Sequence, residues 1–287
     1  MSIDATWLRC PNCLRDVSQV AELVLGCDSG HRFDVSRHGT TTLLPPRAPH
    51  TIGDSREMLD ARARLLDSGV FAPISDAIVA ATSNGDAPAE RSMRIADLGC
   101  GTGYYSARLA DAFPDAQFLV GDRSPIATRM AARAVPRSTG VVLDLWRPLP
   151  IRDASADVIL NVFAPRNPAE FARVLRQGGL LVVVVPTPSH LAELRAYAGL
   201  LDVPSGKDAQ VRDTLSSAGL APVGSERLHC RATVDAAQRD ALIGMGPSAH
   251  HRSSSAPATS DGSTPALASR LDLTVSVDVL SFRHRSG

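Results

Sequence analysis

The chain has 287 residues, of which 44% are hydrophobic, enough for one large domain and a small appendage. Its 30 basic and 30 acidic residues balance, which excludes a strong net charge that would attract a polyanion and counts against simple nucleic-acid binding. The chain start lacks an apolar signal core, and no apolar run is long enough to cross a bilayer. We therefore expect a cytoplasmic protein with reduced thiols and no membrane partner.

A cluster of metal-ligand residues lies near the N-terminus. Cys10 and Cys13 form one close pair, and Cys27 and His31 form a second pair after a hairpin-sized interval. Two such pairs on tight turns are typical of a tetrahedral thiolate–imidazole site, for which zinc is the natural ion, although four unrelated residues in a reduced hairpin remain the alternative. We predict a structural zinc site in an N-terminal domain, residues 1–46. We expect three apolar side chains to form the small interior of this domain, namely Val20, Leu23 and Leu25.

The next segment, residues 47–92, is predicted to be a helical linker. An amphipathic helix should begin at Asp54 or Ser55, and a second helix should cover residues 73–82. The apolar face of the first helix is expected from Met58, Leu59, Leu65 and Leu66.

From residue 93 to residue 287 the pattern alternates between strands and helices, which predicts an α/β fold with a parallel sheet and right-handed crossovers. A closing pair of strands should follow, separated by a Ser-rich loop or weak helix over residues 248–270. The expected strands are 94–99, 116–122, 140–145, 156–163, 180–186, 220–234 and 271–285, and the expected helices are 104–113, 168–179 and 189–201.

A glycine turn follows the first strand of this region. Asp97 ends the strand, and the turn has the spacing G-x-G-x-G before it enters a helix. Glycines let the backbone turn tightly against a ligand, and Asp97 can accept a hydrogen bond from an ammonium group or from the turn. The residues expected at the cofactor here are Asp97, Gly99, Gly101, Gly103, Tyr104 and Tyr105.

Two later strands also end in carboxylates. Asp122 is placed to bind the hydroxyls of a ribose, as a similar acidic residue does in dinucleotide folds. Asp144 could meet an adenine amino group, with Leu145 or Trp146 against the ring face.

This order of motifs resembles the class I S-adenosylmethionine-dependent methyltransferases, with their Rossmann-like fold, over Ile95–Pro186. The competing interpretation is NAD binding, but its expected GxGxxG spacing is absent. The fourth strand ends at Asn161 without the Asn-Pro-Pro-aromatic motif of many enzymes that methylate base amino groups. It also lacks a cysteine pair for C5-pyrimidine methylation.

Together with the N-terminal cysteines, the whole chain resembles the 23S rRNA guanine-N1 methyltransferases, and its NVFAPRNP and MGPS stretches resemble the macrolide-resistance branch. This resemblance implies methylation of guanosine N1 at nucleotide 748 in hairpin 35, resistance to tylosin- or mycinamicin-type macrolides, and 23S rRNA as partner. It also implies that Phe71 and His190 approach the cofactor. From the residues alone, composition favours a core aromatic at Phe71, whereas His190 could equally be a solvent-facing residue at the start of a helix.

The catalytic group is less defined. Guanine N1 carries a proton at neutral pH, so a base or a donor that stabilises the enolate should assist, and Asn161, Asp54 and Glu57 are the candidates. RNA is expected to contact the zinc domain and three linker arginines. A small-molecule methyltransferase and a non-catalytic cofactor-sensing module are the alternatives, and a homodimer is left open. The three arginines are Arg56, Arg62 and Arg64.

Overall fold

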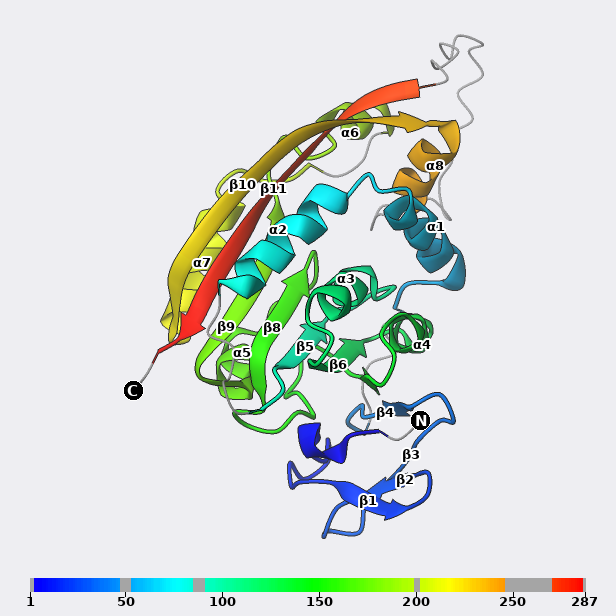
Figure 1. The fold of residues 1–287 in the computed structure, drawn as a ribbon, viewed down its shortest axis with the longest axis vertical. Coiled ribbons are helices and arrows are strands. Elements are labelled where there is room, and N and C mark those ends of the chain that lie inside the picture. Colours follow the sequence, from blue (N-terminus) through cyan, green and yellow to red (C-terminus); the bar gives the residue numbers. More distant parts are fainter. Residues whose placement is uncertain (1–2, 47–52, 85–90, 199–201, 246–269, 286–287) are drawn as a thin grey trace.

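An eight-stranded sheet forms the centre of the molecule in the computed structural model, which describes residues 3–46, 53–84, 91–198, 202–245 and 270–285 (Figure 1). The strand order is β10-β11-β9-β8-β5-β6-β7-β4. Strands β4 to β9 pair in parallel, whereas β11 pairs antiparallel with both β9 and β10. The strands are β4 (Thr40–Thr42), β5 (Arg94–Leu98), β6 (Gln117–Asp122), β7 (Thr139–Val142), β8 (Ala156–Val162), β9 (Leu175–Pro186), β10 (Leu220–Asp235) and β11 (Arg270–His284).

Helices connect these strands and cover the sheet, which confirms the predicted α/β fold with a parallel sheet. Ser55 is the N-cap of the first helix, and its side chain accepts a hydrogen bond from the Met58 amide. The helix buries the predicted apolar face. The helices are α1 (Arg56–Asp67), α2 (Ala72–Ser83), α3 (Tyr104–Ala112), α4 (Pro125–Ala134), α5 (Pro168–Val174), α6 (Ala192–Ala198), α7 (Lys207–Ser217) and α8 (Ala236–Gly244).

A smaller antiparallel sheet occupies the N-terminal region, formed by β1 (Ser18–Ala21), β2 (Val24–Gly26) and β3 (Arg32–Asp34) after the short 3-10 helix η1 (Ala5–Trp7). This region lies at the edge of the large sheet where its parallel strands begin (Figure 1). Arg94, which begins β5, donates a hydrogen bond to the Thr6 hydroxyl, and the Asp4 amide donates to the hydroxyl of Thr139, which begins β7. We call this the amino edge of the sheet, and the opposite side, where the strands end, the carboxyl edge.

The N-terminal region and the large sheet share one hydrophobic core. Trp7 and Leu25 are buried in the same cluster as side chains of β5, β7 and β8. The boundary expected at residue 46 follows β4, which is itself a strand of the large sheet. The expected interior position is wrong for Val20 and Leu23, which are 48% and 42% exposed, because β1 and its turn lie on the outer side of the small sheet.

Several helices differ from the prediction. The helix expected over residues 168–179 ends at Val174, because the chain from Leu175 already pairs with β8 and Gly178 adopts a left-handed conformation. Three helices were not predicted, namely α4, α7 and α8. Nearly all of the Ser-rich segment expected over residues 248–270 lies outside the described residues. Within those described, no single helix is long and apolar enough to span a membrane, and only α1 and α2 together, bent by 80°, meet that criterion by length and composition.

Candidate functional site

The glycine turn lies at the carboxyl edge, where ligands bind in open α/β sheets. Gly99, Gly101 and Gly103 all have positive φ, between 52° and 92°. A side chain at Gly99 would overlap Ala164, and a Cβ at Gly103 would lie 2.6 Å from an α4 backbone atom, so packing excludes side chains at both positions. A Cβ at Gly101 would meet nothing closer than an Arg62 nitrogen at 3.6 Å. The turn therefore leaves open space at Gly101.

Asp122 closes this turn from the end of β6. One carboxylate oxygen accepts the Gly101 amide at 3.0 Å, and the other accepts the Ser124 amide at 2.8 Å. Burial raises the pKa of Asp122 from its usual value, and these two donors oppose that rise. The carboxylate thus holds the turn while keeping lone pairs that could accept ligand hydroxyls.

Asp97 lies inside the protein, only 2% exposed. It accepts a hydrogen bond of 2.5 Å from the hydroxyl of Ser106 on α3, which ties that helix to β5. Burial raises the pKa of Asp97 to about 7. Two aromatic residues predicted at the cofactor, Tyr104 and Tyr105, begin α3 and pack edge to face with ring centres 5.2 Å apart.

Asp144 and Leu145 lie just beyond the end of β7, where the sequence placed an adenine site. Asp144 is 8% exposed, accepts the Trp146 amide at 3.0 Å, and pairs with Arg123 at 3.4 Å. The Leu145 side chain is buried beside the glycine turn. Trp146 differs, since its side chain is 73% exposed.

Asn161 is fully buried at the end of β8. Its amide nitrogen donates to the carbonyls of Leu98, at 2.9 Å, and Pro165, at 3.0 Å. Its Oδ1 is a buried acceptor that has no hydrogen-bond partner in the described part of the chain. These contacts indicate that Asn161 positions the loop after β8 against β5, and its predicted role as a catalytic residue remains a prediction.

Three aromatic rings meet at the same edge. The His190 ring stacks on Phe163, with centroids 5.8 Å apart, and its centroid lies 5.9 Å from that of Phe71. The backbone amide of Ser276 donates to His190 Nδ1 at 3.2 Å, so a neutral ring carries its proton at Nε2. Burial lowers the pKa of His190 to about 4, which keeps the ring neutral.

Phe163 was not singled out from the sequence. It is 42% exposed and has a φ of +53°, an unusual conformation for a residue with a side chain. Strained conformations of this kind persist where the surrounding structure determines them, often at ligand sites. The available signal was an aromatic residue directly after a strand that ends at the carboxyl edge.

The remaining predicted residues lie on or beside α1. Arg62 faces the glycine turn rather than an outer surface, where it pairs with Asp54 and donates to the Met245 carbonyl at 3.0 Å. Arg56 pairs with Asp60 of the same helix at 3.6 Å. Arg64 and Glu57 are exposed. The three arginines therefore have different surroundings, and their contact with RNA remains a prediction. The Asp54 carboxylate is paired with Arg62.

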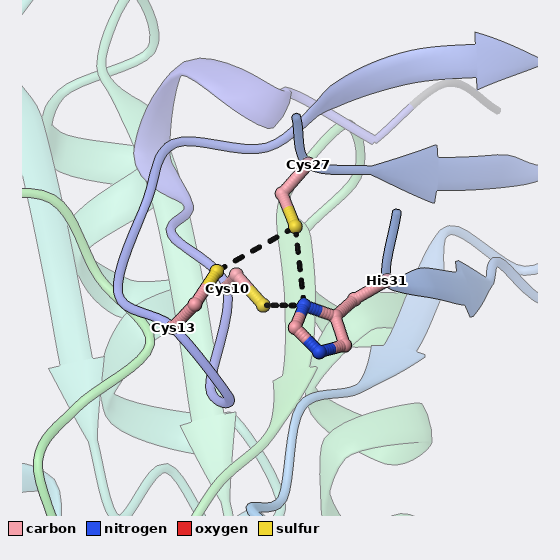
Figure 2. A group of neighbouring side chains, drawn as sticks. All are labelled: Cys10, Cys13, Cys27 and His31. Carbon is pink, nitrogen blue, oxygen red and sulfur yellow. Dashed lines mark hydrogen bonds between the residues drawn. The ribbon is translucent and has the colours of Figure 1, made fainter. Parts of the chain in front are cut away.

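The predicted metal ligands come together at the amino edge. Figure 2 shows the side chains of Cys10, Cys13, Cys27 and His31 pointing toward one another. Their ligand atoms all lie within 4.8 Å of one another, with 3.6 Å between the sulfurs of Cys13 and Cys27 and 3.3 Å from the Cys27 sulfur to His31 Nδ1. Sulfurs bound tetrahedrally at about 2.3 Å from zinc would be about 3.8 Å apart. The cluster therefore has the donors and the size that zinc requires.

Comparisons with known proteins agree with this arrangement. A family described as a methyltransferase domain matches residues 95–179. A 23S rRNA (guanine(748)-N(1))-methyltransferase of Streptomyces fradiae is 42% identical, and the alignment covers 86% of each chain. A Micromonospora griseorubida protein with the provisional name 23S rRNA (guanine-N(1)-)-methyltransferase is 40% identical over 96% of this chain and 97% of its own.

Solved structures support the fold. A provisionally assigned methyltransferase of Haloferax volcanii, in complex with the Trm112 methyltransferase activator, matches with a TM-score of 0.50 and 16% sequence identity. The match covers 82% of this chain and 100% of the matched chain in that structure. At this identity the likeness concerns the methyltransferase fold alone.

Proposed function

The chain belongs to the family of 23S rRNA (guanine-N1)-methyltransferases, and on that premise we propose that it transfers a methyl group from S-adenosylmethionine to N1 of a guanosine in a hairpin loop of 23S rRNA. The observation that carries the proposal is the extent of the similarity to the Micromonospora protein, which reaches far beyond the methyltransferase domain at residues 95–179. The Streptomyces relative is named for nucleotide 748. We extend the proposal to that nucleotide in hairpin 35, and to macrolide resistance as its consequence.

The carboxyl edge fits S-adenosylmethionine, which when bound supplies a methyl group on a sulfonium leaving group. The open position at Gly101 admits a ligand next to the backbone, and the Asp122 carboxylate would accept the ribose hydroxyls. Asp144 and the buried Leu145 would hold the adenine. The unpartnered Oδ1 of Asn161 is a further acceptor at this edge that a ligand donor would satisfy.

The chain's own contribution to the reaction would be positioning and charge stabilisation. Methyl transfer needs the acceptor nitrogen aligned and water excluded. The N1 proton would pass to a carboxylate, for which Asp54 and Glu57 are the candidates, and its loss leaves negative charge on the guanine. His190 would stabilise that charge by donating from Nε2 toward the base oxygen, because its Nδ1 already accepts the Ser276 amide. Phe71 and Phe163 hold the imidazole in that orientation.

Zinc would be a structural ion bound by Cys10, Cys13, Cys27 and His31. The hydroxyl of Ser29 lowers the pKa of the Cys13 thiol to about 6, toward the thiolate that metal binding requires. The site lies at the edge opposite the glycine turn, and a strand of six residues is about 20 Å long. An RNA that contacts both edges would therefore have to extend along the sheet.

Reverse transcription tests the proposed product. A methyl group on N1 replaces the proton needed for base pairing, so reverse transcriptase should stop one nucleotide before a single guanosine of 23S rRNA incubated with enzyme and cofactor. Untreated rRNA is the control. A stop at an adenosine would contradict guanine-N1 specificity. Transfer of label from the cofactor to small metabolites alone would instead favour a small-molecule methyltransferase.

A further inference from the structure

A cavity adjoins the carboxyl edge, separated from the glycine turn by the loop after β8. It has a volume of about 510 Å³, is open to solvent on one side, and is lined by that loop, the end of β9 and helix α7. The volume is in the range of about 300–1,000 Å³ that is typical of sites for small ligands. Trp146 and Phe163 contribute to its wall, and the two rings are among the large apolar side chains most exposed to solvent.

The cavity is also cationic. Arg166 and Lys207, the chain's only lysine, both line it, and both are half-buried. Burial lowers the pKa of each, and for Lys207 the nearby charge of Arg166 lowers it further. None of the described residues that line the cavity is acidic. Two like charges brought together without a counter-ion cost free energy, which an anionic ligand would recover.

Exposed aromatic rings beside cations match the chemistry of a single-stranded nucleotide. Bases stack on aromatic side chains with little sequence preference, and cationic side chains hold the phosphates. An enzyme that acts on a base inside RNA takes that base out of its stack, which also frees the neighbouring nucleotides. Acidic and basic residues balance over the whole chain, so the composition does not reveal this local cationic patch.

We infer that this cavity binds a nucleotide adjacent to the target guanosine, with its base stacked on Trp146 and its phosphate held by Arg166 and Lys207. The inference rests on the proposed function. On this inference, the carboxyl edge holds two sites: a cofactor site at the glycine turn, and a site for single-stranded RNA beyond the loop after β8. Phe163 lies between them, since its ring contacts His190 and also lines the cavity.

The experiment measures RNA and cofactor affinity separately, using a synthetic hairpin-loop fragment of 23S rRNA and S-adenosylmethionine. Trp146→Ala should weaken RNA binding about tenfold, as loss of one stacked base does, and Trp146→Phe should restore most of it. Arg166→Gln and Lys207→Gln should each reduce the slope of log affinity against log salt by about 0.7, the value for one phosphate contact on a single strand. Cofactor affinity should stay unchanged in all four variants.

Arg133→Gln is the matched control, because Arg133 is an exposed arginine in the last turn of α4, next to the start of β7 at the amino edge. It should leave the RNA affinity and its salt slope unchanged. Unaltered RNA affinity in Trp146→Ala, or a loss of cofactor affinity instead, would overturn the inference. If the wild-type enzyme does not methylate RNA at all, the proposed function fails, and this outcome is distinct from the first two.

Discussion

The two edges of the parallel sheet differ in how the charged side chains at each edge are paired. At the amino edge, Arg173 pairs with both Glu170 and Asp153, and Arg9 reaches the same two carboxylates. At the carboxyl edge, the Asn161 oxygen has no partner in the described part of the structure, and the half-buried Lys207 lies near another cation. Unsatisfied buried groups cost stability and persist where a ligand uses them. At the amino edge, opposite charges therefore pair within the protein, whereas Lys207 and Arg166 at the carboxyl edge lie close together as like charges that an anionic ligand would stabilise.

The largest expected effect is at the amino edge. Replacing one thiolate, as in Cys27→Ser, should remove about one equivalent of zinc from protein purified without added metal. Metal binding contributes strongly to the folding of small sites, so the melting temperature should also fall by roughly 10 °C or more. Elemental analysis and calorimetric melting measure the two changes.

Cys230→Ser is the control for this variant, because Cys230 is a free cysteine of β10 outside the cluster. It should retain both metal and stability. Full metal retention in Cys27→Ser would remove Cys27 from the site. A loss of cofactor affinity in the folded Cys27→Ser protein would show that the two edges are coupled.

Asp97 should make stability depend on pH. Its folded pKa is about 7, against an ordinary value of 3.8 for an aspartate, so its contribution to stability is complete below about pH 4 and is lost as pH rises through 7. Asp97→Asn removes this titration, and at pH 8 it should raise the free energy of unfolding by about 2–4 kcal/mol, at about 1.4 kcal/mol per pKa unit. Urea unfolding from pH 5 to pH 8 checks this. A gain that does not grow with pH would contradict the assignment.

A smaller effect is expected from Asp122 at the cofactor site. Asp122→Ala removes a charged acceptor worth about 1.5–3 kcal/mol, so cofactor affinity should fall by roughly ten- to a hundredfold. Titration calorimetry with S-adenosylmethionine measures the change. Asp115→Ala, at an exposed carboxylate just before β6, should bind the cofactor normally. Equal affinities for the two variants would exclude Asp122 from the site.

The smallest expected effect is an absence of titration. Because the pKa of His190 is lowered to about 4, its imidazole should stay neutral between pH 8 and pH 5.5. Nuclear magnetic resonance of the ring carbons would follow the protonation state of His190 across this pH range. Protonation of His190 near pH 6.5 would contradict the proposed role as a neutral donor at Nε2.

The sequence predicted the features that depend on neighbouring residues. Regular alternation located the strands β5 to β9, and paired ligand spacing located the cluster of Cys10, Cys13, Cys27 and His31. The Ser55 cap follows from a local hydrogen bond to the α1 backbone. Such signals lie within short stretches of sequence, so they can be recognised without knowledge of the tertiary structure.

Features that depend on distant residues were not predicted. Helix α7 buries only Val211 and Leu215, so its periodicity is weak. The pairing of Arg62 with Asp54 beside the glycine turn depends on tertiary packing and was also not predicted. Lys207 and Arg166 line the same cavity although they lie about forty residues apart in the sequence. No pattern within a short stretch of sequence predicts that they are neighbours.

The short strand β4 has a further consequence for how the chain can be divided. It consists of Thr40–Thr42, ends the large sheet on one side, and covers the backbone of β7 through pairs such as Thr41 with Val141. Removing the N-terminal region would expose the unpaired amides and carbonyls of β7, together with an apolar surface that Trp7 and Leu25 now cover. An uncovered edge strand of this kind is a template for aggregation. A truncated methyltransferase domain should therefore precipitate during expression, whereas the full chain ends its sheet with a strand too short to recruit another molecule.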